Sequence, residues 1–271
     1  MYAPGRRART KCGTMRGRKR TNEGCPEVNS FAGDLDELQE RLGGPLAAIA
    51  LRERPAAVAG DVDSAGLIAA FGQLLDVMQR LEAGRPSAAA AADVTELGGY
   101  AFSLMERARR LLTPAAPAEA VELARATAAF TAWIVRRGGR IGDLGPVVDS
   151  LALLANRSPE PDELADLATL MLDTIVAAAP MHAQDPDSGI LGWPGRPWRL
   201  LHLNAGIAAT RSRRPELMER AFALLEAHLP QDAAQFFQQG MRQLSLADYP
   251  ESVRSVMKKY FDQWNTAPAI H

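Results

Sequence analysis

The chain has 271 residues, of which 47% are hydrophobic, 23% charged and 6% aromatic, with 31 Lys+Arg against 32 Asp+Glu. This apolar content is typical of globular proteins and excludes a fully disordered chain. The two cysteines, Cys12 and Cys25, lie near the N-terminus, so the rest of the chain excludes a disulfide scaffold, a cysteine-based zinc site and thiol catalysis.

The N-terminal segment is basic. Residues 1–20 hold eight Lys or Arg side chains and no acid, which leaves 23 bases against 32 acids, a net charge of −9, for the remainder. Because residues 1–30 contain few large apolar side chains, we expect a disordered basic tail. It has three interpretations: nucleic-acid binding through phosphate neutralisation, binding to an acidic surface or membrane, or a translated leader upstream of a start at Met15 or later. A transit peptide would carry more Ser and an amphipathic period.

From Phe31 onward the hydrophobic residues follow a helical period almost throughout. In chain order we expect helices at 34–42, within 45–60, and at 63–83, 93–113, 117–138, 143–156, 162–179, 198–212, 215–229, 231–246 and 250–264. Pro180 is expected to end one helix, and Arg136-Arg137-Gly138-Gly139 is typical of a helix C-terminus. No alternating β-branched segment is found. The predicted fold class is therefore all-α, with residues 31–266 forming one domain of antiparallel helical hairpins stacked as a solenoid or bundle.

Prolines at expected helix boundaries recur at Pro146, Pro180, Pro215 and Pro250, with spacings of 34, 35 and 35 residues. At an offset of 35, the last two units align four apolar pairs: Met218 with Val253, Phe222 with Met257, Leu225 with Tyr260, and Leu229 with Trp264. A period near 34 is typical of a helix–turn–helix repeat.

Residues 146–265 thus resemble the tetratricopeptide-like class of helical solenoids. The Trp…Leu-Gly…Tyr pattern of that family's first helix is absent, so the resemblance concerns architecture alone, and an irregular stack or plain bundle remains an alternative. The resemblance implies a long curved face suited to peptides or helices.

Motifs for catalysis or metal binding are missing. The four histidines, His182, His202, His228 and His271, form no H-E-x-x-H motif and no pair at i, i+4. The sequence contains no G-x-x-x-x-G-K-[ST], G-x-G-x-x-G or G-x-S-x-G motif. We therefore expect no metal and no cofactor, and the missing motifs favour a non-catalytic protein.

Residues 181–199 form a connection longer than is usual between helices, and they contain two of the four tryptophans. Clustered Trp and Arg side chains are typical of binding hot spots. The alternative is that both indoles fold back and fill the end of the helix stack. In the helix that follows, Asn204 shares a face with Leu200, Ile207 and Arg211, and a polar residue on an otherwise apolar stripe needs a hydrogen-bond partner.

We therefore expect a cytoplasmic helical-repeat protein that binds a protein partner. The predicted binding residues are Trp193, Arg196, Trp198, Arg199, His202 and Asn204. No membrane span and no secretory signal are expected, because long uncharged apolar stretches are absent. The alternatives are a small-molecule-binding or enzymatic bundle with its site under the 181–199 loop, and nucleic-acid binding through the tail.

Overall fold

The computed structural model describes residues 35–51, 64–84, 88–112, 116–182 and 197–265. These residues form ten helices and no strand, which confirms the predicted all-α class. The helices are α1 (Leu35–Ala50), α2 (Ser64–Ala83), α3 (Ala88–Leu111), α4 (Pro117–Arg136), α5 (Gly145–Arg157), α6 (Pro161–His182), α7 (Pro197–Arg211), α8 (Pro215–His228), α9 (Pro230–Leu246) and α10 (Glu251–Asn265). The predicted tail, residues 1–30, lies outside the described residues.

Proline marks the start of every helix from α4 to α10. It is the first residue of α4, α6, α7, α8 and α9, the second residue of α5, and the residue directly before α10. The first turn of a helix suits proline because its backbone N–H groups have no partner within the helix. The same residue type therefore defines the N-terminal boundary of most of the chain's helices.

Two prolines lie inside helices, contrary to the sequence analysis. Pro45 lies within α1, so the two segments expected at 34–42 and 45–60 form one helix ending at Ala50. Pro180 lies within α6, which continues to His182. Pro180 is exposed and lies in the last turn, where the loss of one backbone N–H is tolerated. Because Pro180 does not begin a helix, the regular spacing of the prolines is not a spacing between successive helix starts.

The C-terminus of α4 has the predicted glycine cap. Gly138 adopts a positive φ of 73°, which a residue without a Cβ adopts most easily. The Gly139 N–H donates to the carbonyl of Ile134 and the Gly138 N–H to that of Val135, both at 3.0 Å. This pair of bonds is the Schellman arrangement, and it turns the chain towards α5.

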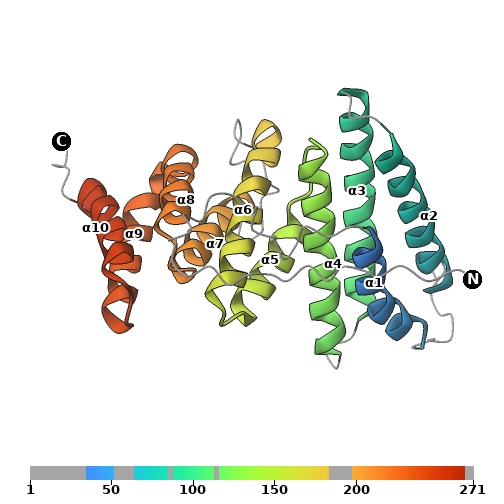
Figure 1. Ribbon diagram of the computed structural model, residues 1–271, viewed down its shortest axis with the longest axis horizontal. Coiled ribbons are helices and arrows are strands. Elements are labelled where there is room, and N and C mark those ends of the chain that lie inside the picture. Colours follow the sequence, from blue (N-terminus) through green and yellow to red (C-terminus); the bar gives the residue numbers. More distant parts are fainter. Residues whose placement is uncertain (1–34, 52–63, 85–87, 113–115, 183–196, 266–271) are drawn as a thin grey trace, which may run out of the picture.

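The helices follow one another along the long axis of the molecule, with α2 and α3 towards one end and α10 at the other (Figure 1). Consecutive helices contact each other throughout, and alternate helices contact in the pairs α3/α5, α4/α6, α5/α7, α6/α8 and α8/α10. The exception to this order is α1, which packs mainly on α4. This open succession is compatible with the helical-repeat architecture that the sequence resembles.

The alignment of the last two units holds in the structure. Met218, Phe222 and Leu225 of α8 and their partners Val253, Met257 and Tyr260 of α10 are all buried, as is Leu229, while Trp264 is half-buried. Helices α8 and α10 contact each other, and α9 contacts both. The two helices therefore use equivalent positions for packing.

Among the described helices, α6 alone is long and apolar enough to cross a membrane by length and hydropathy. Residues within its most apolar 18-residue window are 56% buried, and the helix contacts α4, α5, α7 and α8. A helix that is apolar on all sides is also what the centre of a helix stack requires.

Candidate functional site

The predicted binding residues that the structure describes all lie on α7, but their side chains have different surroundings. Trp198 and His202 are buried, with 4% and 1% of their surface exposed, whereas Arg199 and Asn204 are half-buried. The other two predicted residues, Trp193 and Arg196, lie outside the described residues. The four described side chains therefore do not form one continuous surface.

Three histidines surround the indole of Trp198. His182 from the end of α6 stacks on it, with ring centroids 5.7 Å apart and planes at 16°. His202 and His228 contact it with centroids 4.4 and 5.3 Å away. The indole Nε1 is buried and has no hydrogen-bond partner among the described residues. This cluster joins α6, α7 and α8 at one edge of the helix stack.

The tautomers of the buried imidazoles follow from their hydrogen bonds. His202 Nδ1 lies 2.8 Å from the carbonyl oxygen of Trp198, which only accepts, so Nδ1 carries the proton. Burial lowers the pKa of His202 to about 4, so its Nε2 is unprotonated at neutral pH. That nitrogen lies 2.9 Å from His228 Nδ1, which is therefore the donor. In the described chain, no group of three His, Cys, Asp or Glu side chains is placed to hold a metal.

Arg199 forms an ion pair between helices. Its Nε lies 2.9 Å from both carboxylate oxygens of Asp232, and a terminal nitrogen lies 2.7 Å from Oδ1. Asp232 lies in the first turn of α9, where a carboxylate also suits the helix dipole. The guanidinium thus links α7 to α9.

The outer face of α7 carries aliphatic and amide side chains and ends at Arg211. Leu200, Leu203, Asn204 and Ile207 lie on one side of the helix, opposite the buried residues, and Ile207 is 48% exposed. Asn204 lies half-buried on this stripe, beside Leu200 and Leu203, which pack against the core, so its role in binding stays a prediction. Arg211, at the end of this stripe, donates to the carbonyls of Ala155 and Ser158 at 2.7 and 2.8 Å, which ties α7 to the end of α5.

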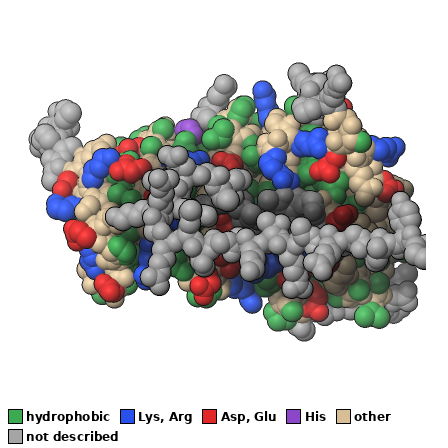
Figure 2. All heavy atoms as spheres, viewed as in Figure 1, with side chains coloured by type: hydrophobic (Ala, Val, Ile, Leu, Met, Phe, Trp, Pro, Cys, Tyr) green, Lys and Arg blue, Asp and Glu red, His purple; other side chains and the backbone are tan. Residues whose placement is uncertain are grey.

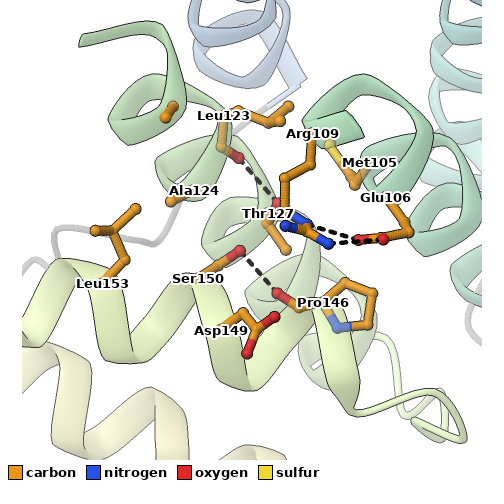
Figure 3. Close-up of a pocket in the computed structure, with 11 residues that line it drawn as sticks. Met105, Glu106, Arg109, Leu123, Ala124, Thr127, Pro146, Asp149, Ser150 and Leu153 are labelled. Atoms are coloured by element: carbon orange, nitrogen blue, oxygen red, sulfur yellow. Dashed lines mark hydrogen bonds and ion pairs between the residues drawn. The ribbon is translucent and has the colours of Figure 1, made fainter. Parts of the chain in front are cut away.

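A cavity of about 280 Å³ lies between α3, α4 and α5 (Figure 3). Its apolar lining consists of Met105, Ala120, Leu123, Ala124, Pro146 and Leu153. Its polar lining consists of Glu106, Arg109, Thr127, Asp149 and Ser150. An apolar pocket with a few polar groups is a common form of binding site.

The charged groups of the cavity lie on two walls (Figure 3). On the α3 wall, Arg109 binds both carboxylate oxygens of Glu106 at 2.7 and 2.8 Å, and Arg110 adds a third bond at 2.9 Å. The hydrogen bond from Arg109 lowers the pKa of Glu106. On the α5 wall, Asp149 has no hydrogen bond or ion pair with any described residue. Partial burial raises the pKa of its carboxyl group, and the charge of Arg109 acts in the opposite direction.

The two hydroxyl groups of the cavity donate hydrogen bonds to backbone carbonyls. Thr127 Oγ1 donates to the carbonyl of Leu123 at 2.9 Å, and Ser150 Oγ donates to that of Pro146 at 2.7 Å. Each oxygen then retains only lone pairs for a ligand. The cavity therefore presents mainly hydrogen-bond acceptors, with Asp149 as its unpaired charge.

Sequence reasoning did not find this cavity. Its lining comes from three helices, and no motif joins Glu106 or Arg109 to Asp149, which is forty residues further along the chain. Their proximity results from the packing of α3 and α5 over α4. Lys, Arg, Asp and Glu side chains are interspersed over the face of the molecule seen in Figure 2, so charge does not mark the site either.

Comparison of the chain with family models, curated proteins and solved structures found no match. Functional interpretation therefore depends on the α7 face and the cavity.

Proposed function

We propose that the chain is a non-catalytic helical-repeat protein that binds a protein partner along the outer surface of α3, α5 and α7. The observation that carries this proposal is the outer face of α7, where Ile207 is exposed beside the half-buried Leu200, Leu203 and Asn204. Exposed helix faces in soluble proteins are normally charged or polar, and an exposed apolar stripe is typical of an interaction site.

The order of helix contacts supports an extended surface. Helix α5 contacts both α3 and α7, so these three helices lie next to one another. Asp149 and Leu153 lie on the outer side of α5, between the α7 stripe and the α3 wall of the cavity. Solenoids commonly bind extended peptides or helices on such a surface.

The enzymatic alternative has less support. Trp198, His202 and His228 fill the space beside the start of α7, and the hydroxyls of Thr127 and Ser150 donate to backbone carbonyls rather than to a general base. The cavity volume of about 280 Å³ lies just below the range of roughly 300–1,000 Å³ typical of small-molecule sites. Nucleic-acid binding through residues 1–30 remains a prediction outside the described residues.

The proposal is tested by panning a random-peptide display library against the purified full chain. We expect a set of related peptides that bind saturably and lose binding to Ile207→Asp. The matched control is Val176→Asp, because Val176 is an exposed aliphatic residue on α6, outside the proposed surface. Failure to enrich any peptide, or equal binding to Ile207→Asp and the unmodified chain, would overturn the proposal. Circular dichroism checks that both variants remain folded.

A further inference from the structure

We propose that the cavity between α3, α4 and α5 receives a Lys or Arg side chain of the protein partner. The basic group would lie against Asp149, and its aliphatic stem against Leu123 and Leu153. This inference rests on the proposed function, because the side chain belongs to the bound protein. The partner must therefore present a basic side chain at one point of the surface.

The charges of the cavity favour a cation. Its lining contains two carboxylates and one guanidinium, and the Glu106–Arg109 pair is joined by two hydrogen bonds. Asp149 forms no hydrogen bond or ion pair with a described residue, and the nearby charge of Arg109 offsets its negative charge only in part. Asp149 is exposed at the rim, and the partial burial of its carboxyl group disfavours the charged form, which an incoming cation would stabilise.

The hydrogen-bonding groups of the cavity favour the same ligand. Thr127 Oγ1 and Ser150 Oγ donate their hydrogen bonds to backbone carbonyls, so in this arrangement their lone pairs are what they present to a ligand. Ammonium and guanidinium groups have donors and no acceptor, which complements these oxygens and Asp149. A carboxylate ligand would instead meet two like charges, while the guanidinium that would bind it is already engaged with Glu106.

The shape of the cavity suits one long side chain. Its floor is apolar, with Met105, Leu123 and Leu153 among the lining residues. Lys and Arg bury their methylene stems against apolar surface while the charged group remains near water and polar partners. Asp149 lies on α5 at a largely exposed position, which places the charge at the rim of the cavity and not at its floor.

The test uses small mimics of the basic side chains on the full folded chain. Propylguanidinium and butylammonium are titrated at millimolar concentration and followed by methyl NMR of Met105, with butyrate as an anion of similar length. We expect both cations to shift the Met105 methyl resonance saturably and butyrate to leave it unchanged. Asp149→Asn should weaken cation binding at least threefold. The control Asp173→Asn, which changes another carboxylate that is partly removed from solvent, should leave the affinity unchanged.

Two results would overturn the inference. One is saturable binding of butyrate without binding of either cation, which would assign the cavity to anions through Arg109. The other is equal cation affinity in Asp149→Asn and the unmodified chain.

The failure of this inference is distinguishable from that of the proposed function. If the panned peptides keep their affinity when every Lys and Arg is replaced by Met, the inference is wrong and the proposed function stands. If no peptide is enriched although the cations bind at Asp149, the proposed partner is wrong and only the cavity's preference for cations stands.

Discussion

His202 Nε2 and His228 Nδ1 lie 2.9 Å apart and form a hydrogen bond between neutral imidazoles from α7 and α8. The first ring also donates from Nδ1 to the carbonyl of Trp198, so the pair is anchored to the start of α7. Protonation of both rings would place two cations in direct contact in a buried cluster. The hydrogen bond therefore makes the packing of α7 on α8 sensitive to acid.

Stability is expected to fall at mildly acidic pH. Burial lowers the pKa of His202 from 6.5 to about 4 and also lowers that of His228. The unfolded chain therefore binds protons at pH values where the folded chain does not. Above about pH 6.5 the histidines are neutral in both states and do not reduce the free energy of unfolding. As the pH falls from there towards 4, protonation of the unfolded chain lowers this free energy. For His202 this amounts to about 3 kcal/mol in the free energy of unfolding.

Urea unfolding at about pH 7.5 and pH 4.5 measures this effect. His202→Gln removes the titrating group, so the difference in unfolding free energy between the two pH values should shrink by on the order of 2 kcal/mol. His271→Gln removes a histidine outside the described residues and serves as the control. An unchanged pH dependence in His202→Gln would show that this histidine does not titrate with a lowered pKa.

Two adjacent glycines in α3 are expected to respond oppositely to alanine. A Cβ at Gly98 would lie 2.8 Å from Ile134 Cδ1 of α4, whereas a Cβ at Gly99 would meet nothing within 4 Å. Gly99→Ala should stabilise the chain by up to about 1 kcal/mol through helix propensity. Gly98→Ala should forfeit this gain and destabilise the α3–α4 contact by about 1–3 kcal/mol. Thermal unfolding of the two variants gives the comparison, and equal stabilities would contradict the close approach of α3 to α4.

The stability that the Arg199–Asp232 ion pair contributes is expected to depend on the two-point geometry of the guanidinium. Lysine retains the charge but not the two-point contact, so Arg199→Lys should lower the unfolding free energy by about 1 kcal/mol or less, since Arg199 is 39% exposed. The control is Arg220→Lys at a looser pair, where the distance to Asp173 is 3.6 Å. Chemical unfolding should show a smaller effect at Arg220, and an effect equal to that at Arg199 would argue against a specific bidentate contact.

The helices could be predicted from sequence because their apolar period is regular and prolines precede or begin most of them. Pro45 and Pro180 do not end their helices, because a helix tolerates proline where tertiary packing or a solvated last turn offsets the missing N–H. The Schellman turn at Gly138 was predictable because few residues other than glycine adopt its positive φ.

The candidate site was less predictable because it depends on which helix faces are covered. Helix α7 is apolar on nearly all sides, so its period does not reveal that Asn204 is half-buried while Trp198 and His202 are buried. The cavity depends on the packing of α3 and α5 over α4, and the sequence carries no local pattern for Asp149 as its unpaired charge. Both features are set by contacts between helices and not by local propensity.

The most direct measurement of partner binding on the outer surface is a methyl NMR footprint of a panned peptide on the full chain. We predict saturable shifts at Met105 of α3, Leu153 of α5 and Ile207 of α7, with Val176 of α6 unaffected. Two results would contradict binding along α3, α5 and α7. One is a set of shifts confined to Val176 and other residues of the even-numbered helices. The other is the absence of saturable shifts with every recovered peptide.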